Sequence, residues 1–547
     1  MARLFLFILI FLSFTSYSQT PYSRYDSLKG GLTPLRTSFD IFYYDLELEI
    51  DPGKKHIEGS NTIYYQVVED FDSIQIDLFS NFSIKKISNE NTELDYTRDS
   101  NFLFIKLDGN KGDKAQLKIE YEGEPISAKK APWDGGFVWT KDQSSNPWVG
   151  VACQGTGTSL WWPCKDHFSD EPDSMRLSFT VPDSLYCASN GTLRNIVRQG
   201  SRTTFEWFVH YPINSYNATL NIGKYAYWKD SLQRPDGSML LLEYYVLEDH
   251  LGKAQKHFQQ VGKILNTFEK YFGSYPFPND GYALIETPYW GMEHQSAISY
   301  GNNFETDLID FDFIIVHESA HEWWGNSLTA PDIGELWIHE TFATYAEALL
   351  IEDRYGFEKS LVYLKEQKAL IKNKVPLMLP PGVHFFNSQD TDIYYKGSWI
   401  LHTLRNFVSN DSLWFGSIKR LSTQHTLSTI TTKEVIRFFE KALQKDLQSF
   451  FSQYLYHSSL PVLEYYIKEK GHNRRLYYRW KTDVTDFKMP VLLKMNNEKL
   501  TLPCSSKFKY RKLKGGDGSG FEFMTSFQLI DIQKIENPEN KNNLPNR

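Results

Sequence analysis

Two histidines four residues apart are the strongest chemical signal in the sequence. They belong to the run His317-Glu318-Ser319-Ala320-His321. Residues i and i+4 of a helix lie on the same face, so two imidazoles placed in this way can bind one metal ion. The apolar stretch from Phe311 to Val316 and the Gly325-Asn326 pair predict that the motif lies on a buried helix that ends just past Trp324.

A third ligand of the right type follows at a suitable distance along the chain. Pro331 to Gly334 interrupts the helical pattern after the first helix, and a second helix is predicted from about Glu335 to Tyr355. Glu340 lies one turn into it, 19 residues after His321. Antiparallel packing of the two helices would bring this carboxylate to the histidines. A lone histidine pair would fit an ordinary core helix, but two His and one Glu leave the fourth tetrahedral position to water, as in catalytic zinc sites. We therefore predict one Zn²⁺ per chain, bound by His317, His321 and Glu340.

Glu318 is placed to act on that water. It follows His317 directly and is turned from it by about 100° of helix, so it can flank the metal without binding it. Zinc lowers the pKa of a bound water toward about 7, and Glu318 can take its proton as the hydroxide attacks a polarised carbonyl. The predicted reaction is amide hydrolysis with Glu318 as general base.

With these residues in place, the sequence resembles the zinc aminopeptidases of the aminopeptidase N and leukotriene hydrolase family. The resemblance rests on the motif HExxH, separated by 18 residues from a Glu. It also rests on the run Trp323-Trp324-Gly325-Asn326, which begins two residues after His321. It covers about Ser38 to Tyr466 and implies a thermolysin-like, α-rich catalytic domain. It also implies peptide substrates with a free N-terminus.

Three further matches imply substrate-binding and catalytic roles. Trp290-Gly291-Met292-Glu293-His294 resembles the family's Gly-x-Met-Glu-Asn, whose Glu binds the free amino group, so Gly291, Met292 and Glu293 are candidate substrate-binding residues. Tyr394-Tyr395-Lys396-Gly397 resembles its Tyr-x-Lys-Gly, whose first Tyr stabilises the oxyanion. Gln154 matches a Gln that lines the amino-terminal pocket.

Elementary chemistry agrees with these roles. A carboxylate such as Glu293 in a dry pocket binds an ammonium group by charge-assisted hydrogen bonds. A phenol such as that of Tyr394 donates to an oxyanion, and loss of such a donor typically costs about 2.7–4 kcal/mol. Tyr395 is the rival for this role, because periodicity alone does not separate the two; the family register favours Tyr394. For Gln154, a plain strand residue is the alternative.

The sequence departs from the family pattern at a few points. His294 replaces the usual Asn, Thr341 replaces the Gly after the third ligand, and Glu322 replaces the Gln after the second His. None of the three is a metal ligand, but His294 puts amino-group recognition in doubt. Many members also have a long helical C-terminal domain, whereas only about 85 residues follow Pro461 here, so the cleft is expected to be more open.

Periodicity divides the chain into three folded parts, and the predicted fold class is a multidomain α+β protein. Residues 19–229 alternate as in half-buried strands and predict an N-terminal all-β domain. Residues 230–460 are rich in helical patterns and form the predicted zinc metallopeptidase domain. Alternation returns in 461–536, a small C-terminal β domain, and 537–547 is expected to be a flexible tail.

The N-terminus reads as a secretory signal peptide of residues 1–18. Arg3 precedes an unbroken apolar run from Leu4 to Leu12, and Ser16-Tyr17-Ser18 offers a cleavage site. The run is too short to span a bilayer, which takes about 18 residues, so no integral membrane span is expected after cleavage, and the protein should be secreted or periplasmic. A bridge between Cys153 and Cys164 and buried free thiols are both compatible with the sequence.

The composition argues against other classes of function. The 547 residues include 41% hydrophobic and 23% charged residues, as in globular proteins, and carry a net charge of −8, which is unsuited to binding nucleic acid. A secreted zinc aminopeptidase is the function we expect. A thermolysin-like endopeptidase and an inactive peptide-binding protein on the same scaffold are the alternatives; an epoxide hydrolase activity would need further pocket residues that we do not identify. The sequence does not indicate the oligomeric state.

Overall fold

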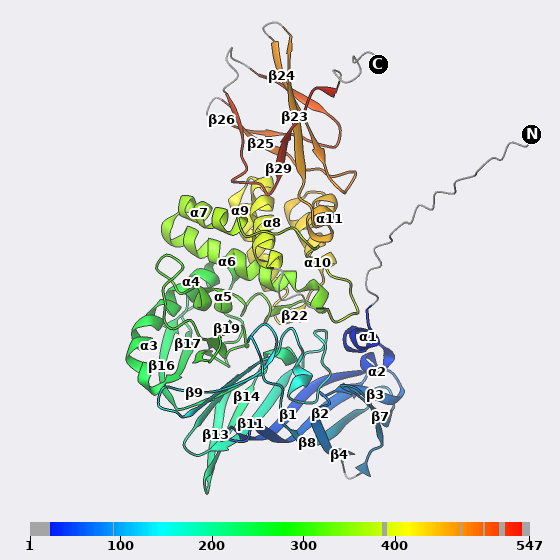
Figure 1. Ribbon diagram of the computed structural model, residues 1–547, viewed down its shortest axis with the longest axis vertical. Coiled ribbons are helices and arrows are strands. Elements are labelled where there is room, and N and C mark those ends of the chain that lie inside the picture. Colours follow the sequence, from blue (N-terminus) through cyan, green and yellow to red (C-terminus); the bar gives the residue numbers. More distant parts are fainter. Residues whose placement is uncertain are drawn as a thin grey trace, which may run out of the picture.

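The chain forms three parts that follow one another along the longest axis of the molecule (Figure 1). The computed structural model describes residues 22–90, 92–385, 391–470, 473–495, 498–513 and 520–538. β-Sheets make one end, helices fill the middle, and a smaller β part makes the other end. The chain passes through these parts in sequence order, so each part is built mainly from one continuous stretch.

The N-terminal part consists of β-sheets, and its first strand is one of several that bury about every second side chain. In the long first strand, Tyr44, Leu46, Leu48 and Ile50 are buried, because successive residues of a strand point to opposite faces. An eight-stranded sheet has the order β13-β14-β11-β1-β2-β8-β4-β5, with a four-stranded sheet β12-β15-β10-β9 and a three-stranded sheet β3-β7-β6. One cluster of buried apolar residues joins the sheets into a common core.

The elements of this part are α1 (Arg24–Gly30), α2 (Pro34–Thr37), β1 (Phe39–Asp51), β2 (His56–Val67), β3 (Phe71–Asp77), β4 (Phe82–Asn89), β5 (Thr92–Glu93), β6 (Tyr96–Asp99), β7 (Phe102–Gly109), β8 (Lys114–Gly123), β9 (Gly136–Lys141), β10 (Pro147–Ala152), β11 (Ser174–Pro182), β12 (Tyr186–Ser189), β13 (Thr192–Gln199), β14 (Arg202–Val209) and β15 (Leu220–Gly223), with short 3₁₀ turns η1 (Thr158–Leu160) and η2 (Ser215–Asn217).

The middle part begins with a five-stranded sheet of order β16-β17-β18-β20-β19. Its strands are β16 (Tyr225–Gln233), β17 (Met239–Leu247), β18 (Tyr282–Glu286), β19 (Gly291–Met292) and β20 (Ile298–Tyr300). β16 pairs with β17 along its whole length, so the predicted boundary between residues 229 and 230 falls inside a strand of this sheet. The short β19 is the edge strand and pairs with β20.

Helices make up the rest of the middle part. Apolar residues at three- and four-residue steps give α4 a buried face, and Gly273 closes it with a φ of 98° that favours glycine. The helices are α3 (Leu251–His257), α4 (Val261–Phe272), α5 (Phe313–Ala320), α6 (Trp337–Tyr355), α7 (Phe357–Lys368), α8 (Asp392–Val408), α9 (Asp411–Gln424), α10 (Thr432–Leu443) and α11 (Gln448–Tyr456), with the 3₁₀ turns η3 (Glu248–His250), η4 (Phe258–Gln260) and η5 (Ile333–Glu335) and the parallel pair β21 (Leu328–Thr329) and β22 (Ser428–Thr429).

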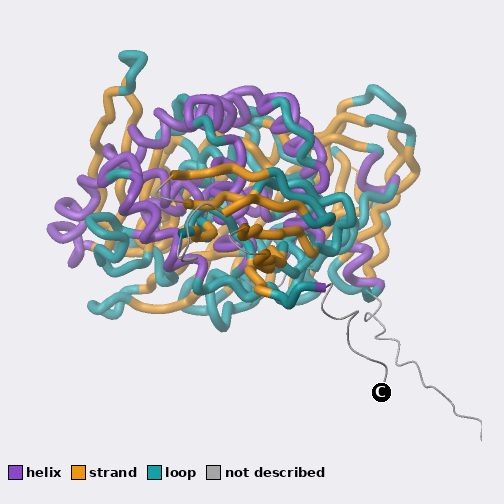
Figure 2. The backbone as a smooth tube through the Cα atoms, turned by 90° about the horizontal axis from the view of Figure 1, so that it is seen from above, coloured by secondary structure: helices purple, strands orange, loops and turns teal. Residues whose placement is uncertain are grey.

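The C-terminal part contains two small sheets, of order β27-β24-β23-β29 and β26-β25-β28. Seen from above, its strands lie in front of the helices (Figure 2). Its buried residues belong to the same apolar cluster as the helices, and the Tyr454 hydroxyl donates to the carbonyl of Leu529 (2.7 Å). Its strands are β23 (Val462–Lys470), β24 (Asn473–Lys481), β25 (Val491–Met495), β26 (Glu498–Leu502), β27 (Lys509–Leu513), β28 (Phe521–Phe523) and β29 (Asp531–Lys534).

The predicted fold class is confirmed: the protein is a mixed α+β protein with a β-rich N-terminal part, a helical middle part and C-terminal β-sheets. The four cysteines are buried and free, so Cys153 and Cys164 form no bridge. Within the described ranges, the structure contains no helix that combines the length and the apolar character needed to cross a membrane. The predicted signal peptide and residues 539–547 of the predicted tail lie outside the described residues.

Candidate functional site

Helix α5 carries the two histidines, but it is shorter than predicted. The Asp312 side chain accepts a hydrogen bond from the backbone N–H of Ile314 (3.0 Å) and caps its N-terminus. The helix ends at Ala320 rather than past Trp324, and His321 occupies the C-cap with helical φ and ψ of −63° and −21°. His321 therefore stays in helical register with the residues before it although the regular helix has ended.

The backbone after His321 explains this early end. The N–H of Asn326 donates to the carbonyl of His321 (3.0 Å), and the N–H of Ser327 donates to that of Glu322 (3.2 Å). These bonds span five residues instead of four, so the regular helical ladder is broken at this turn. The apolar pattern continues through Trp324, which is why periodicity alone predicted a longer helix.

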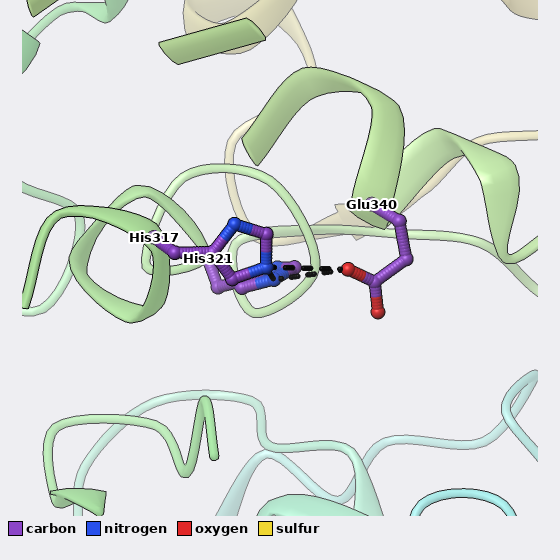
Figure 3. A group of neighbouring side chains, drawn as sticks. All are labelled: His317, His321 and Glu340. Carbon is purple, nitrogen blue, oxygen red and sulfur yellow. Dashed lines mark hydrogen bonds and ion pairs between the residues drawn. The ribbon is translucent and has the colours of Figure 1, made fainter. Parts of the chain in front are cut away.

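Three atoms of metal-ligand type meet where α5 faces the first turn of α6 (Figure 3). Nε2 of His317 and Nε2 of His321 are 3.2 Å apart, and they lie 3.5 and 3.4 Å from Oε2 of Glu340. All three side chains are at most 7% exposed. Two helices thus bring together the residues that the spacing of the sequence had predicted.

Neighbouring groups fix the two imidazoles in the form that binds metals. Nδ1 of His317 donates to Oε1 of Glu347 (2.7 Å), and Nδ1 of His321 donates to the carbonyl of Trp324 (2.8 Å). Because a carbonyl only accepts, the proton of a neutral His321 sits on Nδ1 and its Nε2 carries a lone pair. The carboxylate of Glu347 orients His317 in the same way.

Glu347 is not among the predicted site residues, although its position in the sequence gives a signal for it. It lies seven residues after Glu340, which is two turns along α6 and therefore on the same face of the helix. Its other oxygen accepts hydrogen bonds from the side chains of Tyr363 and Gln367. Glu347 is thus held in place on the side away from His317.

The triangle fits a zinc ion. Four tetrahedral ligands at about 2.0–2.1 Å from zinc lie about 3.3–3.4 Å from one another, close to the separations of the three ligand atoms. Oε2 of Glu340 is buried and has no hydrogen-bond partner among the described residues. Burial lowers the pKa of His321, but the carboxylates of Glu340 and Glu293 raise it more, to about 9. The surroundings therefore favour positive charge at this point, which a bound cation would supply.

Glu318 faces the same cavity and is packed against Gly291 of the edge strand β19. A Cβ atom at residue 291 would lie 2.5 Å from Oε1 of Glu318 and 2.8 Å from Cγ2 of Ile314. Burial raises the pKa of Glu318 to about 8, and the neighbouring carboxylates of Glu293 and Glu340 add to this rise. A cation at the ligands would lower this pKa again. The position suits a carboxylate that takes a proton from water.

Glu293 forms a second, buried acidic position next to the metal ligands. Its Oε1 accepts hydrogen bonds from Nε2 of Gln154 and from the hydroxyl of Tyr216 (3.2 Å), and its backbone carbonyl accepts from Nδ2 of Asn326 (2.8 Å). Burial raises its pKa, since an ion is poorly solvated there. A cationic group in the cavity would pair with this carboxylate.

Tyr216 is held in turn by His339, and neither residue was predicted. The backbone N–H of Ala330 donates to Nε2 of His339 (2.8 Å). The proton of the neutral imidazole is therefore on Nδ1, which faces the Tyr216 hydroxyl at 3.5 Å. Burial lowers the pKa of His339 to about 3, so it stays neutral. Tyr216 lies on η2 in the N-terminal part, 77 residues before Glu293, and no local spacing connects the two.

Tyr394 and Tyr395 both line the cavity, but their surroundings differ. The ring of Tyr394 is 5.9 Å from that of His317, and burial and then the carboxylates of Glu340, Glu293 and Glu318 raise the pKa of its phenol well above 10. Tyr395 is less buried, and burial and Glu347 raise its pKa. Tyr394 is therefore the phenol beside the metal ligands, and it stays protonated and able to donate.

His294 does not face the cavity. Its Nδ1 is 3.0 Å from the hydroxyl of Ser299, it is fully buried, and burial lowers its pKa to about 3. The residues that line the cavity include Met292 and Glu293 but not His294. Its replacement of the usual Asn therefore leaves the lining of the cavity unchanged.

The other two departures from the family pattern, Thr341 and Glu322, are accommodated by their hydrogen bonds and packing. The hydroxyl of Thr341 donates to the carbonyl of Ile393 (2.9 Å) and lies against Gly397, where a Cβ would be 1.8 Å from Oγ1. Glu322 is buried and accepts hydrogen bonds from the hydroxyl of Tyr275 and the backbone N–H of Ser296. Burial raises its pKa to about 7.

Every predicted site residue lines one cavity of about 170 Å³. The structure therefore brings Gln154 of the N-terminal part to residues of β19, α5, α6 and α8. The predicted residues that line it are Gln154, Gly291, Met292, Glu293, His317, Glu318, His321, Glu340 and Tyr394, together with the rival Tyr395. Aromatic side chains that were not predicted form one wall: Trp133, Trp290 and Phe313.

Comparison with known proteins places these features in a family context. The family described as "Peptidase family M1 domain" matches residues 257–454, and "Peptidase M1 N-terminal domain" matches residues 42–216. A solved M1 zinc metallopeptidase from Deinococcus radiodurans has a similar fold, with a TM-score of 0.66, 19% identity, and 78% of this chain and 95% of that chain covered. A two-domain M1 zinc metallopeptidase variant bound to L-tryptophan has a TM-score of 0.68 at 20% identity and covers 78% of this chain and 96% of that chain.

Similar sequences are named as aminopeptidases. "Probable aminopeptidase 2" of Sulfurisphaera tokodaii is 22% identical over 84% of this chain and 59% of its own length. "Aminopeptidase N" of Lactobacillus helveticus is 22% identical over 80% of this chain and 53% of its own length. The chain thus spans little more than half the length of the curated relatives it matches.

Proposed function

The chain belongs to peptidase family M1, and we propose that it is a zinc-dependent aminopeptidase that removes the N-terminal residue from peptides with a free amino group. The observation that carries the proposal is the position of Glu293. Its buried carboxylate, held by Gln154 and Tyr216, lies in the same cavity as the His317, His321 and Glu340 ligand set. An ammonium group bound there would place the first peptide bond of a substrate at the metal position.

The residues of the chain divide the chemistry among them. When bound, zinc supplies Lewis acidity, which polarises the scissile carbonyl and lowers the pKa of water toward about 7. Glu318 takes a proton from the attacking water and returns it to the amine that leaves. Tyr394 donates its phenolic hydrogen to the oxygen that becomes negative. Gln154 and Glu293 hold the substrate amino group by charge-assisted hydrogen bonds.

The two alternatives have less support. A thermolysin-like endopeptidase would use the same zinc ligands, but it has no need of a buried carboxylate at the end of the substrate site. An inactive peptide-binding protein would have no need of a buried Glu318 pressed against Gly291. The pKa of the Tyr394 phenol, raised by burial and then by three carboxylates, also suits a donor that must remain protonated during catalysis.

We also propose that the protein is exported, on the N-terminal sequence alone. Arg3, the apolar run from Leu4 to Leu12 and the small residues up to Ser18 have the features of a signal peptide. N-terminal sequencing of the protein from a culture medium or periplasmic extract should begin at Gln19. A protein found only in the cytosol with its first residues intact would contradict export.

The proposed function can be tested with purified protein. Zinc analysis should find one equivalent per chain, and a panel of aminoacyl fluorogenic substrates should be hydrolysed. Glu318→Gln and Tyr394→Phe should keep zinc and lose turnover, the latter by about 10²- to 10³-fold. Tyr395→Phe is the matched control and should cost far less. A zinc-loaded protein that turned over no aminoacyl substrate would contradict the proposal. If Tyr394→Phe had no effect and Tyr395→Phe reduced turnover, the role of oxyanion donor would belong to Tyr395.

A further inference from the structure

Aromatic rings form a continuous wall of the cavity that begins at His317 and ends at Trp133. Phe313 stacks on His317 with ring centroids 5.5 Å apart and planes at 23°. Trp290 stacks on Phe313 at 5.6 Å and 29°, and Trp133 follows at 6.0 Å. Trp290 is 41% exposed. Such a large exposed aromatic surface inside a cavity is an apolar binding surface rather than part of the core.

The position of Trp290 is fixed before any ligand binds. Its indole N–H donates to Oδ1 of Asn302 (3.0 Å), and Nδ2 of Asn302 donates to Oδ1 of Asp312 (2.9 Å). Asp312 is the N-cap of α5. The wall is therefore tied to the helix that carries His317 and His321, and a ligand that packs on it pays little entropy for ordering the ring.

The wall lies on the far side of the scissile bond from the amine position. In the turn that follows the end of α5, Asn326 donates to the backbone carbonyl of Glu293 (2.8 Å). In the middle, Gly291 touches Glu318. At the other end, Trp290 stacks on Phe313 in the first turn of the helix. An extended chain advances about 3.3 Å per residue, so the three steps from Glu293 back to Trp290 span at most about 10 Å.

A substrate must follow this order. Its ammonium group binds at Glu293, its first carbonyl lies beside Glu318, and its second residue passes Phe313 and Trp290. We propose that the wall of Trp133, Trp290 and Phe313 binds the side chain of the second residue of the peptide and selects large apolar, above all aromatic, side chains there. The inference rests on the proposed aminopeptidase function and adds the substrate class.

An exposed positive charge beside Trp133 sharpens this selection. Nζ of Lys130 lies 5.3 Å from the centre of the Trp133 ring, so the wall already carries a cation on its outer ring. A second residue with a positive side chain would meet this ammonium group. Phe or Trp at the second position should therefore be favoured over Lys as well as over Ala.

Unblocked dipeptides with one constant first residue test the inference: Leu-Phe, Leu-Trp, Leu-Ala and Leu-Lys. Burial of an aromatic side chain should raise kcat/KM for Leu-Phe over Leu-Ala by about 10- to 100-fold. Trp290→Ala and Trp133→Ala should each reduce this ratio, and Trp290→Phe should keep most of it. Tyr510→Ala, which removes a 52% exposed ring of the C-terminal part, should leave the ratio and the rates unchanged. Zinc content and Tm show that each variant is folded.

The outcomes separate this inference from the proposed function. Hydrolysis of all four dipeptides with kcat/KM values within twofold of one another would overturn the inference and leave the aminopeptidase intact. A preference for Phe that survived both Trp290→Ala and Trp133→Ala in folded, zinc-loaded protein would also overturn it. Cleavage of none of the dipeptides by zinc-loaded protein would overturn the proposed function, and the inference with it.

Discussion

Gly291 and Glu318 are in such close contact that a side chain at residue 291 would collide with the carboxylate. A Cβ there would lie 2.5 Å from Oε1 of Glu318, a separation that real Cβ atoms do not adopt. The sequence motif indicated Gly291 as a substrate-binding residue, and the structure adds that the absence of a side chain leaves room for the proposed general base. The edge strand β19 and the helix α5 meet at this point.

Gly291→Ala should therefore damage catalysis without removing zinc. The added methyl group would displace the Glu318 carboxylate, and a misplacement of about 1 Å can cost about 10²-fold in rate. We expect kcat to fall by about that factor while the zinc content stays at one equivalent. Gly416→Ala is the matched control, since no atom lies within 4 Å of a Cβ there. Equal activity of the two variants would contradict the role of this contact.

Glu347→Ala should weaken zinc binding although Glu347 is not a ligand. Its Oε1 accepts the Nδ1 hydrogen of His317 (2.7 Å) and fixes the orientation of that imidazole. Loss of such a partner typically costs 10- to 100-fold in metal affinity. Competition with a chelator measures the zinc Kd, with Glu366→Ala on the exposed face of α7 as control. An unchanged Kd in Glu347→Ala would refute this positioning role.

Tyr216→Phe should weaken recognition of the substrate amino group. The variant loses the hydroxyl that donates to Glu293 at 3.2 Å, and a hydrogen bond to a charged group contributes about 1.5–3 kcal/mol. We expect kcat/KM for unblocked substrates to fall by about 10- to 100-fold, mainly through KM, with zinc retained. A drop confined to kcat would instead place Tyr216 in the chemical step.

His402 should make stability depend on pH. It is fully buried between α8 and the C-terminal part, its Nε2 donates to the carbonyl of Ser526 (3.1 Å), and burial lowers its pKa to about 4. The pKa in the unfolded chain is about 6.5, so the stabilising contribution is present above pH 6.5 and is lost as the pH falls toward 4. From pH 7 to 5 the loss is about 2 kcal/mol. His402→Gln keeps a donor but does not titrate, so its free energy of unfolding should fall less over this range; parallel curves in denaturant titrations would rule the effect out.

The meeting of His317, His321 and Glu340 could be predicted from the sequence, because it requires only the geometry of one helix and its packing against the next. His317 and His321 are one helical turn apart, and Glu340 follows on the next helix after the turn at 331–334. Tyr216 could not be predicted in this way, because its link to Glu293 depends on the packing of the N-terminal part against the middle part. The end of α5 could not be predicted either. Trp323 and Trp324 continue the apolar pattern, whereas the regular helix ends at Ala320.

The boundary between the first two parts shows the same limit. β16 alternates in the same manner as the strands before it, so periodicity assigned its first residues to the N-terminal part. Only its pairing with β17 shows that it begins the next sheet. The aromatic wall could not be predicted for a related reason. Trp133, Trp290 and Phe313 are separated in the sequence, and composition does not distinguish a stacking surface from a core.

Mass spectrometry of a single peptide, offered with a free and with an acetylated N-terminus, distinguishes an aminopeptidase from an endopeptidase. Zinc-loaded protein should shorten the free peptide one residue at a time from its N-terminus. The acetylated form should resist, because it lacks the ammonium charge that Glu293 binds and adds bulk where the cavity ends. Glu293→Ala should weaken binding of the free peptide while zinc stays bound. Cleavage of both forms at internal bonds and at equal rates would contradict the account and identify an endopeptidase.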